Sequence, residues 1–361
     1  MNHNLNILYL LIFSLIFISP FINCQEESFN LEVKYPIAFT LLNQNIIIYS
    51  SKGFYTFNSD LSSLIYSYNF TNELIFDEYN SIDIYYPSIS QYLDDEGGNI
   101  LIFVFQNIYL FNNNGKFISE NSLNNIIYSN EITYIIVPFK YLDNDCYYAL
   151  VYIYNQKINF LYSKINKENG NNEILINTYY ENNDREISHL GLSCKRMKKN
   201  NKYYIICLYS YFSNSKPLLA VEIFDFNNNF AFLERKEYEA NSLAAYIKSI
   251  VNNEESKIYI CYLAGGYSYC IYFDIITNQF SKRIETGNSC KINNFSFNFN
   301  FFKNTGEFIF SCNDNFHTFI FSKFDENMNF INQQEQLTRT ISDGRLLFNK
   351  FIFNCLYNAQ K

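Results

Sequence analysis

The feature that most constrains the fold of this 361-residue chain is a repeat of about fifty residues that runs along most of it. Apolar, strand-like runs recur after polar turns, and three prolines spaced 51 residues apart each open such a run: Pro36, Pro87 and Pro138. A second apolar run follows each first one. The spacing of these second runs varies between 43 and 55 residues, and they begin near Ile46, Ile100, Tyr148, Tyr203, Ile258, Glu307 and Lys350.

Each unit continues with two more runs. A third run ends in a turn rich in Asn, Asp or Gly, and three successive units place an aspartate there, 49 and 51 residues apart: Asp225, Asp274 and Asp325. A fourth run follows this turn. Helical periodicity does not extend over a useful length anywhere in the chain. We therefore expect four short β strands in each unit, joined by tight turns.

Four strands in each fifty-residue unit, repeated six times with a partial seventh, resemble the pattern of a β-propeller. A four-stranded sheet cannot cover both of its faces alone, whereas sheets that pack radially bury these faces against one another. A β-sandwich, with about seven strands per hundred residues, fits the period less well. The predicted fold class is all-β, a β-propeller of four-stranded blades. Seven blades, the last one incomplete, are favoured over six.

The resemblance is to the architecture and not to a named type of propeller. The chain has no Trp, so it departs from WD, kelch and Asp-box repeats. Ring closure has a sequence basis, because Phe29–Tyr35 alternates like a half-buried strand and the half-unit Leu346–Tyr357 lacks outer strands. Pairing the two would remove two free sheet edges. We therefore expect residues 25–361 to form one domain, with a sequence truncated at its C-terminus as an alternative.

The N-terminus predicts export. Ile7–Ile18 holds twelve residues with one polar member, Ser14, which is the length of a signal-peptide core and too short to span a bilayer. The segment before it has no Lys or Arg, which departs from the usual pattern. We expect residues 1–24 to be a signal peptide cleaved before Gln25; an anchor over Leu5–Ile22 is the alternative. No second apolar run of eighteen residues follows, so we expect a secreted or cell-surface protein without a membrane span.

Eight cysteines remain after Cys24, and an even number in an exported chain predicts disulfides. Neighbouring antiparallel strands bring Cα atoms within reach of a bridge. The predicted bridges, each within one unit, are Cys194–Cys207, Cys261–Cys270 and Cys290–Cys312. The two cysteines left, Cys146 and Cys355, lie in units three and seven. We expect both to be unpaired, or Cys355 to pair beyond the chain's end. Asn69 and Asn294 each begin a glycosylation sequon.

One strongly basic run stands out in unit four. We expect it in the loop between the first two strands of that unit, and its cations are Lys195, Arg196, Lys198, Lys199 and Lys202. A solvated hairpin loop is the simplest interpretation. The functional interpretation is a contact for an anionic glycan or an acidic protein. The equivalent loops of other units are acidic, as in Asp94–Glu96 and Asn252–Glu255, so the sign of the charge varies between units.

The sequence excludes some function classes. A net charge of −8 argues against a nucleic-acid binder that neutralises phosphates. Hydrolase and phosphate-loop motifs are missing, and no close cysteine pair predicts a metal site. We therefore predict no catalytic residues, no metal and no cofactor. The predicted function is an exported, non-enzymatic scaffold that binds a protein or glycan.

Two other functions stay open. One is a glycan-cleaving hydrolase of the sialidase or glycosidase type, and the other is the ectodomain of a longer membrane protein. Two carboxylates about 5–10 Å apart at the channel mouth would favour the hydrolase. A mouth filled by Phe and Tyr would favour the binding scaffold.

Overall fold

The computed structural model describes residues 36–42, 45–50, 53–58, 63–69, 88–91, 100–104, 106–112, 115–123, 132–142, 144–166, 168–181, 186–187, 191–200, 202–252, 254–285, 298–302, 307–315 and 318–337. The predicted signal peptide and the half-unit Leu346–Tyr357 lie outside these residues. The one helical element described is a short 3-10 turn, Phe226–Asn228. Within the described ranges, no helix has the length and apolarity that crossing a membrane requires.

Antiparallel strands form six sheets in this part of the chain. The first three sheets hold β1 (Pro36–Leu42), β2 (Asn45–Ser50), β3 (Gly53–Asn58) and β4 (Leu64–Asn69); β5 (Ser88–Gln91), β6 (Ile100–Val104), β7 (Asn107–Phe111) and β8 (Phe117–Ser122); and β9 (Tyr134–Leu142), β10 (Asp145–Tyr154), β11 (Lys157–Asn166) and β12 (Asn172–Glu181). The next three hold β13 (Glu186–Ile187), β14 (Ser193–Lys199), β15 (Lys202–Ser213), β16 (Lys216–Asp225) and β17 (Ala231–Glu239); β18 (Ala244–Val251), β19 (Lys257–Ala264), β20 (Tyr267–Asp274), β21 (Gln279–Phe280) and β22 (Ile284–Glu285); and β23 (Asn298–Phe302), β24 (Glu307–Asn315), β25 (Thr318–Phe324) and β26 (Phe330–Leu337).

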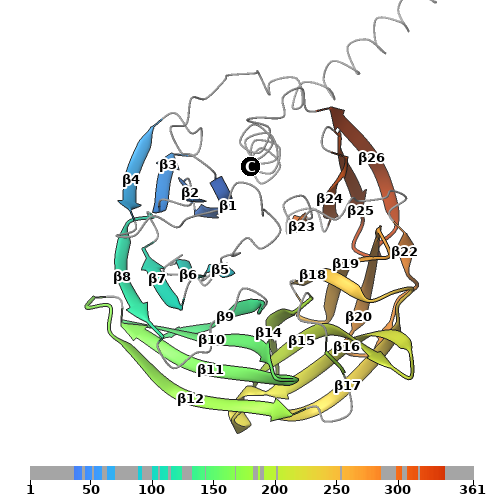
Figure 1. Ribbon diagram of the computed structural model, residues 1–361, viewed down its shortest axis with the longest axis horizontal. Helices are drawn as coiled ribbons and strands as arrows, with labels where there is room; N and C mark the ends of the chain where they lie inside the picture. Colours follow the sequence, from blue (N-terminus) through green and yellow to red (C-terminus); the bar gives the residue numbers. More distant parts are fainter. Residues whose placement is uncertain are drawn as a thin grey trace, which may run out of the picture.

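The sheets follow one another around a common centre, with an early strand of each sheet nearest to it and the last strand outermost (Figure 1). This arrangement is a β-propeller, so the predicted fold class is confirmed. We call the sheets blade 1 (β1–β4), blade 2 (β5–β8), blade 3 (β9–β12), blade 4 (β13–β17), blade 5 (β18–β22) and blade 6 (β23–β26). The residues predicted to form a seventh blade lie outside the described ranges.

The predicted strand starts agree closely with the structure. The second runs of units one, two, five and six begin at β2, β6, β19 and β24. The first run of unit three is an exception, because Pro138 lies in the middle of β9 rather than at its start. Pro138 pairs with Tyr148 beside a register shift. Proline lacks the N–H that a central strand needs, and β9 tolerates it because this strand is an edge of its sheet.

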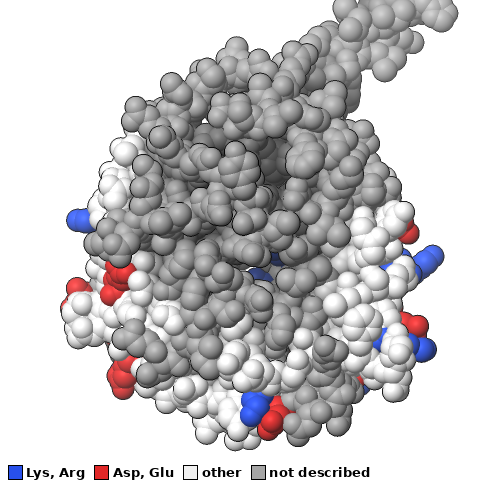
Figure 2. Space-filling model, viewed as in Figure 1, with Lys and Arg blue, Asp and Glu red and all other residues white. Residues whose placement is uncertain are grey.

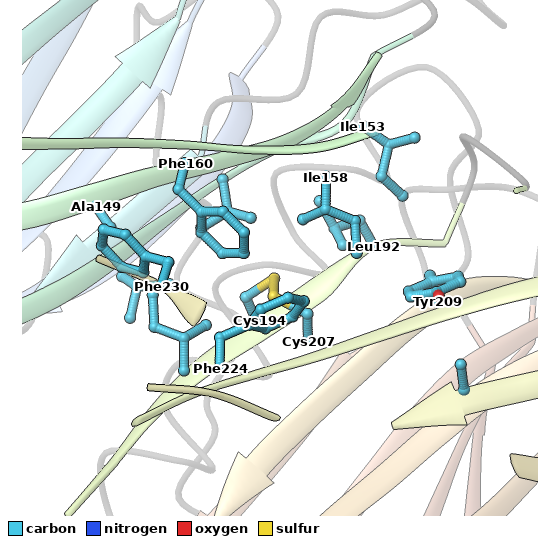
Figure 3. Packing of buried hydrophobic residues seen from close by; sticks show 14 of the residues in the cluster. Ala149, Ile153, Ile158, Phe160, Leu192, Cys194, Cys207, Tyr209, Phe224 and Phe230 are labelled. Atoms are coloured by element: carbon cyan, nitrogen blue, oxygen red, sulfur yellow. A yellow bond between two sulfur atoms is a disulfide. The ribbon is translucent and has the colours of Figure 1, made fainter. Parts of the chain in front are cut away.

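Buried apolar side chains fill the space between neighbouring blades. Between blades 3 and 4, Phe160 stacks on Phe230 with ring centroids 4.9 Å apart and meets Phe224 edge-on at 4.8 Å. Figure 3 shows these rings next to the Cys194–Cys207 disulfide. Because successive side chains of a strand point to opposite faces, β10 contributes to this cluster and also to the one between blades 2 and 3. Both faces of the central strands are therefore buried, which explains why their sequences are almost continuously apolar.

The turn between the third and fourth strands joins each blade to the one before it. The aromatic rings of Phe139 in blade 3 and Phe226 in the blade 4 turn stack at 4.2 Å. The other contacts are hydrogen bonds, from Thr56 Oγ1 to Gly115 O at 2.7 Å, Asn121 Nδ2 to Gly170 O at 2.8 Å, Asn278 Nδ2 to Glu234 Oε1 at 2.6 Å and Tyr259 OH to Glu326 O at 2.6 Å. The polar turns seen in the sequence therefore bind blades together as well as reversing the chain.

Candidate functional site

The basic run of unit four lies on a strand and not in a loop. Lys195, Arg196, Lys198 and Lys199 belong to β14, whose register with β15 continues to the pair Lys199↔Lys202. The predicted loop is therefore wrong, because β14 continues to Lys199 and β15 begins at Lys202. The physical reason is that β14 is the strand of blade 4 nearest the centre (Figure 1), so its edge faces water and tolerates charged residues inside a regular ladder.

The two faces of β14 use their cations differently. The Arg196 guanidinium lies 5.4 Å and the Lys198 Nζ 5.8 Å from the ring centre of Tyr203 on the paired strand. The backbone N–H of Lys198 also donates to the Glu255 carboxylate in the turn before β19. Arg196 and Lys198 thus help to hold blade 4 together and against the acidic turn of blade 5.

Lys195 lies on the other face of β14, beside the contact with blade 5. Ser193 and Ser249, both buried, share a hydrogen bond of 2.7 Å between their hydroxyl oxygens. Lys195 follows Ser193 by two residues, and Lys248 precedes Ser249 by one. Both lysines are exposed. Figure 2 shows a few basic atoms near the middle of this face of the molecule.

The protein lowers the pKa of both ammonium groups. Surrounding protein lowers the pKa of Lys195 to about 8, with a further contribution from the positive charge of Lys248. The surrounding protein also lowers the pKa of Lys248. The surrounding protein thus makes the charged form of both lysines less favourable than it is in water.

Most other lysines with a contact in the described part of the chain have a carboxylate partner. Those pairs are Lys157–Glu181, Lys164–Glu173, Lys216–Glu239, Lys236–Glu234 and Lys323–Glu307. Lys195 and Lys248 have none among the described residues. The six strands nearest the centre, β1, β5, β9, β14, β18 and β23, contain Lys and Arg but no Asp or Glu. The described inner strands therefore contribute neither residue of the carboxylate pair that would favour a glycosidase.

Sequence reasoning missed Lys248. It is a lone cation in an otherwise apolar strand, AAYIKSIV, and the charge run that drew attention to β14 has no counterpart there. The sequence did contain a usable signal for Lys248, because a single charged residue in the apolar first strand of a blade indicates a side chain near the centre of the ring. Glu234, Glu237 and Tyr238 bring two acids and a tyrosine together in the sequence, and they lie on the outer strand β17.

An ion pair within blade 4 reaches the neighbouring blade 3. The carboxylate of Glu222 on β16, fully buried, accepts from Nε of Arg235 at 2.6 Å, and the Arg235 guanidinium also lies 3.5 Å from the Tyr180 hydroxyl of blade 3. Burial and the negative charge of Glu222 raise the pKa of Tyr209. These groups are enclosed by packing. We assign them a structural role, because breaking a buried ion pair leaves an uncompensated charge.

Two predicted disulfides are confirmed. Cys194–Cys207 and Cys261–Cys270 each join residues directly opposite one another on neighbouring strands, with Cα atoms 4.2 Å apart. Cys146 is buried on β10, and Cys312 lies on β24. Cys290 and Cys355 lie outside the described residues, so the predicted Cys290–Cys312 bridge stays a prediction, as do the expected states of Cys146 and Cys355.

The remaining predicted sites are placed in part. Asn69 is exposed at the end of β4, where a glycan could be attached, and Asn294 lies outside the described residues. Lys202 begins β15. In the described ranges, no group of three or more His, Cys, Asp or Glu side chains is arranged to hold a metal ion.

Comparison with known proteins shows the fold and nothing finer. No protein-family model matches the sequence, and no curated protein matches it. Among solved structures the chain is similar to the Dos1 propeller, with a TM-score of 0.53 and 12% identity over 88% of this chain and 75% of that one.

Two further structures are similar. A functionally unknown protein from Desulfotomaculum acetoxidans gives a TM-score of 0.54 and 11% identity over 84% and 86% of the two chains. A fungal lectin from Aleuria aurantia, a six-bladed β-propeller, gives a TM-score of 0.51 and 7% identity over 82% of this chain and 92% of the lectin chain.

Proposed function

We propose that this chain is an exported, non-enzymatic β-propeller that binds a protein or glycan in the extracellular space or at the cell surface. The observation that carries the proposal is that two exposed lysines, Lys195 and Lys248, lie on the inner strands β14 and β18 of the ring. A rigid ring of sheets holds them in place, and no carboxylate partner lies on the described inner strands. Ligand sites are typically concave, with a few polar groups fixed in position by the scaffold.

Two further observations support export and binding. Disulfides persist in oxidising compartments, and two cross-strand bridges lie in blades 4 and 5. The Aleuria aurantia lectin recognises fucose on a six-bladed propeller, so a scaffold of this architecture is suited to sugar recognition. We propose that residues 1–24 are removed as a signal peptide and that Asn69 and Asn294 carry glycans.

The test is expression of the full chain with its own N-terminus in a eukaryotic secretory host. We expect protein in the medium that begins at or near Gln25, and we expect it to bind saturably on a glycan array or to cross-link to an extracellular protein. A variant lacking residues 2–24 is the matched control and should stay inside the cell. Retention of the full chain inside the cell, or secreted protein that binds neither glycans nor proteins, would contradict the proposal.

A further inference from the structure

We propose that Arg283 of blade 5, together with Tyr238 of the neighbouring blade 4, binds the carboxylate group of an acidic sugar. Arg283 directly precedes β22, and Tyr238 lies on β17. The site is on the outer strands, apart from the lysines of β14 and β18, and its residues belong to the described ranges 202–252 and 254–285. The inference rests on the proposed function and adds a chemical class of ligand to it.

The first observation is that Arg283 lacks the carboxylate that an equivalent arginine has. Three residues before the turn aspartate, blade 4 has Glu222, which pairs with Arg235. Blade 5 has Ile271 at this position, and continuing the register of β20 with β22 by one residue places Arg283 opposite it. No described carboxylate, including that of Glu285, forms an ion pair with Arg283. Residues 286–297, which follow along the chain, contain no Asp or Glu.

The second observation is that buried tyrosines hold the guanidinium in place. The guanidinium carbon of Arg283 lies 5.0 Å from the ring centre of Tyr269, and this ring lies 5.6 Å from that of Tyr262. Both tyrosines are buried, and Nδ2 of Asn241 donates to the Tyr269 hydroxyl at 3.2 Å. Arg283 itself is only half-buried. A ligand can therefore reach a charge whose position is set before binding, which lowers the loss of conformational freedom.

The third observation is that blade 4 faces Arg283 with a tyrosine. Tyr238 packs on the same cluster of buried residues as Tyr262 and Tyr269. It lies five residues after the register shift residue of β17, as Tyr180 does in β12, and the Tyr180 hydroxyl lies 3.5 Å from the guanidinium of Arg235. Burial raises the pKa of Tyr238, and the positive charge of Arg283 opposes this shift. The half-buried Tyr238 thus occupies the place beside Arg283 that Tyr180 occupies beside Arg235.

The balance of donors and acceptors identifies the ligand group. A guanidinium offers five N–H donors. The hydroxyl of Tyr238 adds another donor, and the buried hydroxyl of Tyr262 has no well-formed hydrogen bond to any described residue. The site therefore has more donors than acceptors and one uncompensated positive charge. A carboxylate supplies the missing charge and accepts two parallel hydrogen bonds from a guanidinium.

The surroundings of Arg283 favour a sugar over a protein as the source of this carboxylate. The exposed residues next to it are polar: Asn241, Lys282 and Glu285. Specific protein interfaces have an apolar centre, whereas sugar hydroxyls exchange hydrogen bonds with amide and charged side chains. An acidic sugar therefore matches both the guanidinium and its rim.

The test is calorimetric titration of the full chain with a uronic acid oligosaccharide and with its carboxyl-reduced form. Wild-type protein should bind the acidic form at least about tenfold more tightly, because charge-assisted hydrogen bonds to the carboxylate are lost in the reduced form. Arg283→Gln should weaken binding of the acidic form by about tenfold or more. Arg283→Lys should recover only part of this loss, because lysine lacks the planar fork of donors. Tyr238→Phe should weaken binding between about twofold and tenfold.

The matched control is Lys282→Gln, which removes the same net charge from the adjacent residue, on the opposite face of the chain. Its affinity should stay within about twofold of wild type. Circular dichroism checks that every variant is folded. Should Arg283→Gln fail to fold, Tyr238→Phe and the two forms of the sugar on wild-type protein still decide the outcome.

The outcomes separate this inference from the proposed function. Folded Arg283→Gln that binds as wild type does, or wild-type protein that does not prefer the acidic sugar, would overturn the site. A neutral glycan or a protein can still bind in that case, and the proposed function would then stand alone. Binding of an acidic peptide that requires Arg283, without binding of the oligosaccharide, would overturn the sugar as the ligand. Conversely, Arg283-dependent binding by a chain that its host retains inside the cell would keep the site and remove export from the proposed function.

Discussion

Hydrogen bonds in the turns explain why Asp225, Asp274 and Asp325 recur 49 and 51 residues apart. In blade 5, Asp274 Oδ1 accepts hydrogen bonds from the backbone N–H groups of Ile276 and Thr277, both at 2.9 Å. Asp225 and Asp325 accept backbone N–H bonds in the equivalent turns of blades 4 and 6. Side chains of this kind mimic a backbone turn and hold the chain reversal in place. The recurring Asp is therefore structural and is no sign of a calcium or substrate site.

Replacing Asp274 by Ala should lower the free energy of unfolding by about 1 kcal/mol at pH 7, because two backbone donors lose their acceptor. The hydrogen bond from Thr277 N is the largest cause that lowers the pKa of Asp274. A carboxyl whose pKa is lower in the folded state stabilises that state above its unfolded pKa, and the gain is lost as pH falls through the lowered value. Urea unfolding at pH 7 and pH 2.5 measures both effects.

The difference between wild type and Asp274→Ala should therefore shrink at pH 2.5. Asp274→Asn keeps an acceptor oxygen and serves as the control, with a smaller loss that does not depend on pH. A gap of equal size at both pH values would show that the carboxylate charge has no part in the turn.

The charge of Lys195 lowers the stability of the folded state, whereas the charge of Asp274 raises it. A lysine whose folded pKa, about 8 here, lies below its unfolded value destabilises the folded state wherever it is protonated in both states. Stability then rises with pH between the two pKa values. Lys195→Gln should therefore be more stable than wild type at pH 7 in the absence of ligand, and the gain should vanish near pH 10.5.

Urea unfolding at pH 7 and at pH 10 checks this expectation. Lys216→Gln, which removes an exposed lysine paired with Glu239 at 3.5 Å, is the control and should give no gain. A Lys195→Gln variant less stable than wild type at pH 7 would mean that the ammonium group has a stabilising partner.

At the scale of the strands, the sequence predicted well which strands form and in which order, but it did not predict the irregularities in their pairing. Apolar runs bounded by Asn, Asp and Gly place most strands to within a few residues, because burial on both faces leaves a strong pattern. The sequence gives no sign of the bulge that recurs in the fourth strand of five blades, where an apolar residue is skipped in the ladder. The skipped residues are Ile65, Ile118, Leu175, Leu233 and Ile331.

A glycine in the turn between the third and fourth strands should be essential where two blades meet. Gly170 has a φ of +71°, and a Cβ atom there would lie 2.2 Å from the Cβ of Ser119 in blade 2. Gly170→Ala should lower the free energy of unfolding by about 2–4 kcal/mol, the sum of left-handed backbone strain and the forced shift of packed atoms. Equilibrium unfolding in urea measures it.

Gly266 provides the matched control. Its φ is +84°, but no atom lies within 4 Å of the position that a Cβ would take, so Gly266→Ala should lose about 1 kcal/mol from backbone strain alone. Adding Ser119→Gly to Gly170→Ala should recover part of the larger loss. Equal losses at Gly170 and Gly266 would contradict the close contact between blades.

Each disulfide should stabilise one blade by a similar amount. The bridged cysteines are 13 and 9 residues apart in the sequence. For loops of this size, the chain-entropy model gives a stabilisation of about 3 kcal/mol for each bridge. Replacing Cys261 and Cys270 together by Ala should therefore lower the free energy of unfolding by about that amount. Non-reducing peptide mapping of the secreted protein should also detect the predicted Cys290–Cys312 link, and a bridge between different blades would contradict the predicted unit boundaries.

At the scale of the whole molecule, the sequence could predict the ring but not what the ring brings together. Repeats of four strands favour radial packing, because this arrangement covers both faces of every sheet. The contact between β14 and β18 could not be predicted in the same way. Lys195 and Lys248 are 53 residues apart, and no local pattern in either strand encodes that the two strands meet at the Ser193–Ser249 hydrogen bond. The basic run drew attention to Lys195 and not to Lys248, and it predicted the wrong local structure.

Ring closure is the prediction that concerns the chain as a whole. Pairing of Phe29–Tyr35 with the half-unit Leu346–Tyr357 would remove the free edges at both ends of the series of sheets. A chain ending at Arg345 should then melt about 5 °C or more below the full chain, and so should a chain lacking residues 29–35. Because each segment would stabilise the molecule only through the other, the double deletion should cost no more than the larger single deletion. Thermal unfolding followed by circular dichroism measures the four proteins, and additive losses would show that the two segments do not pair.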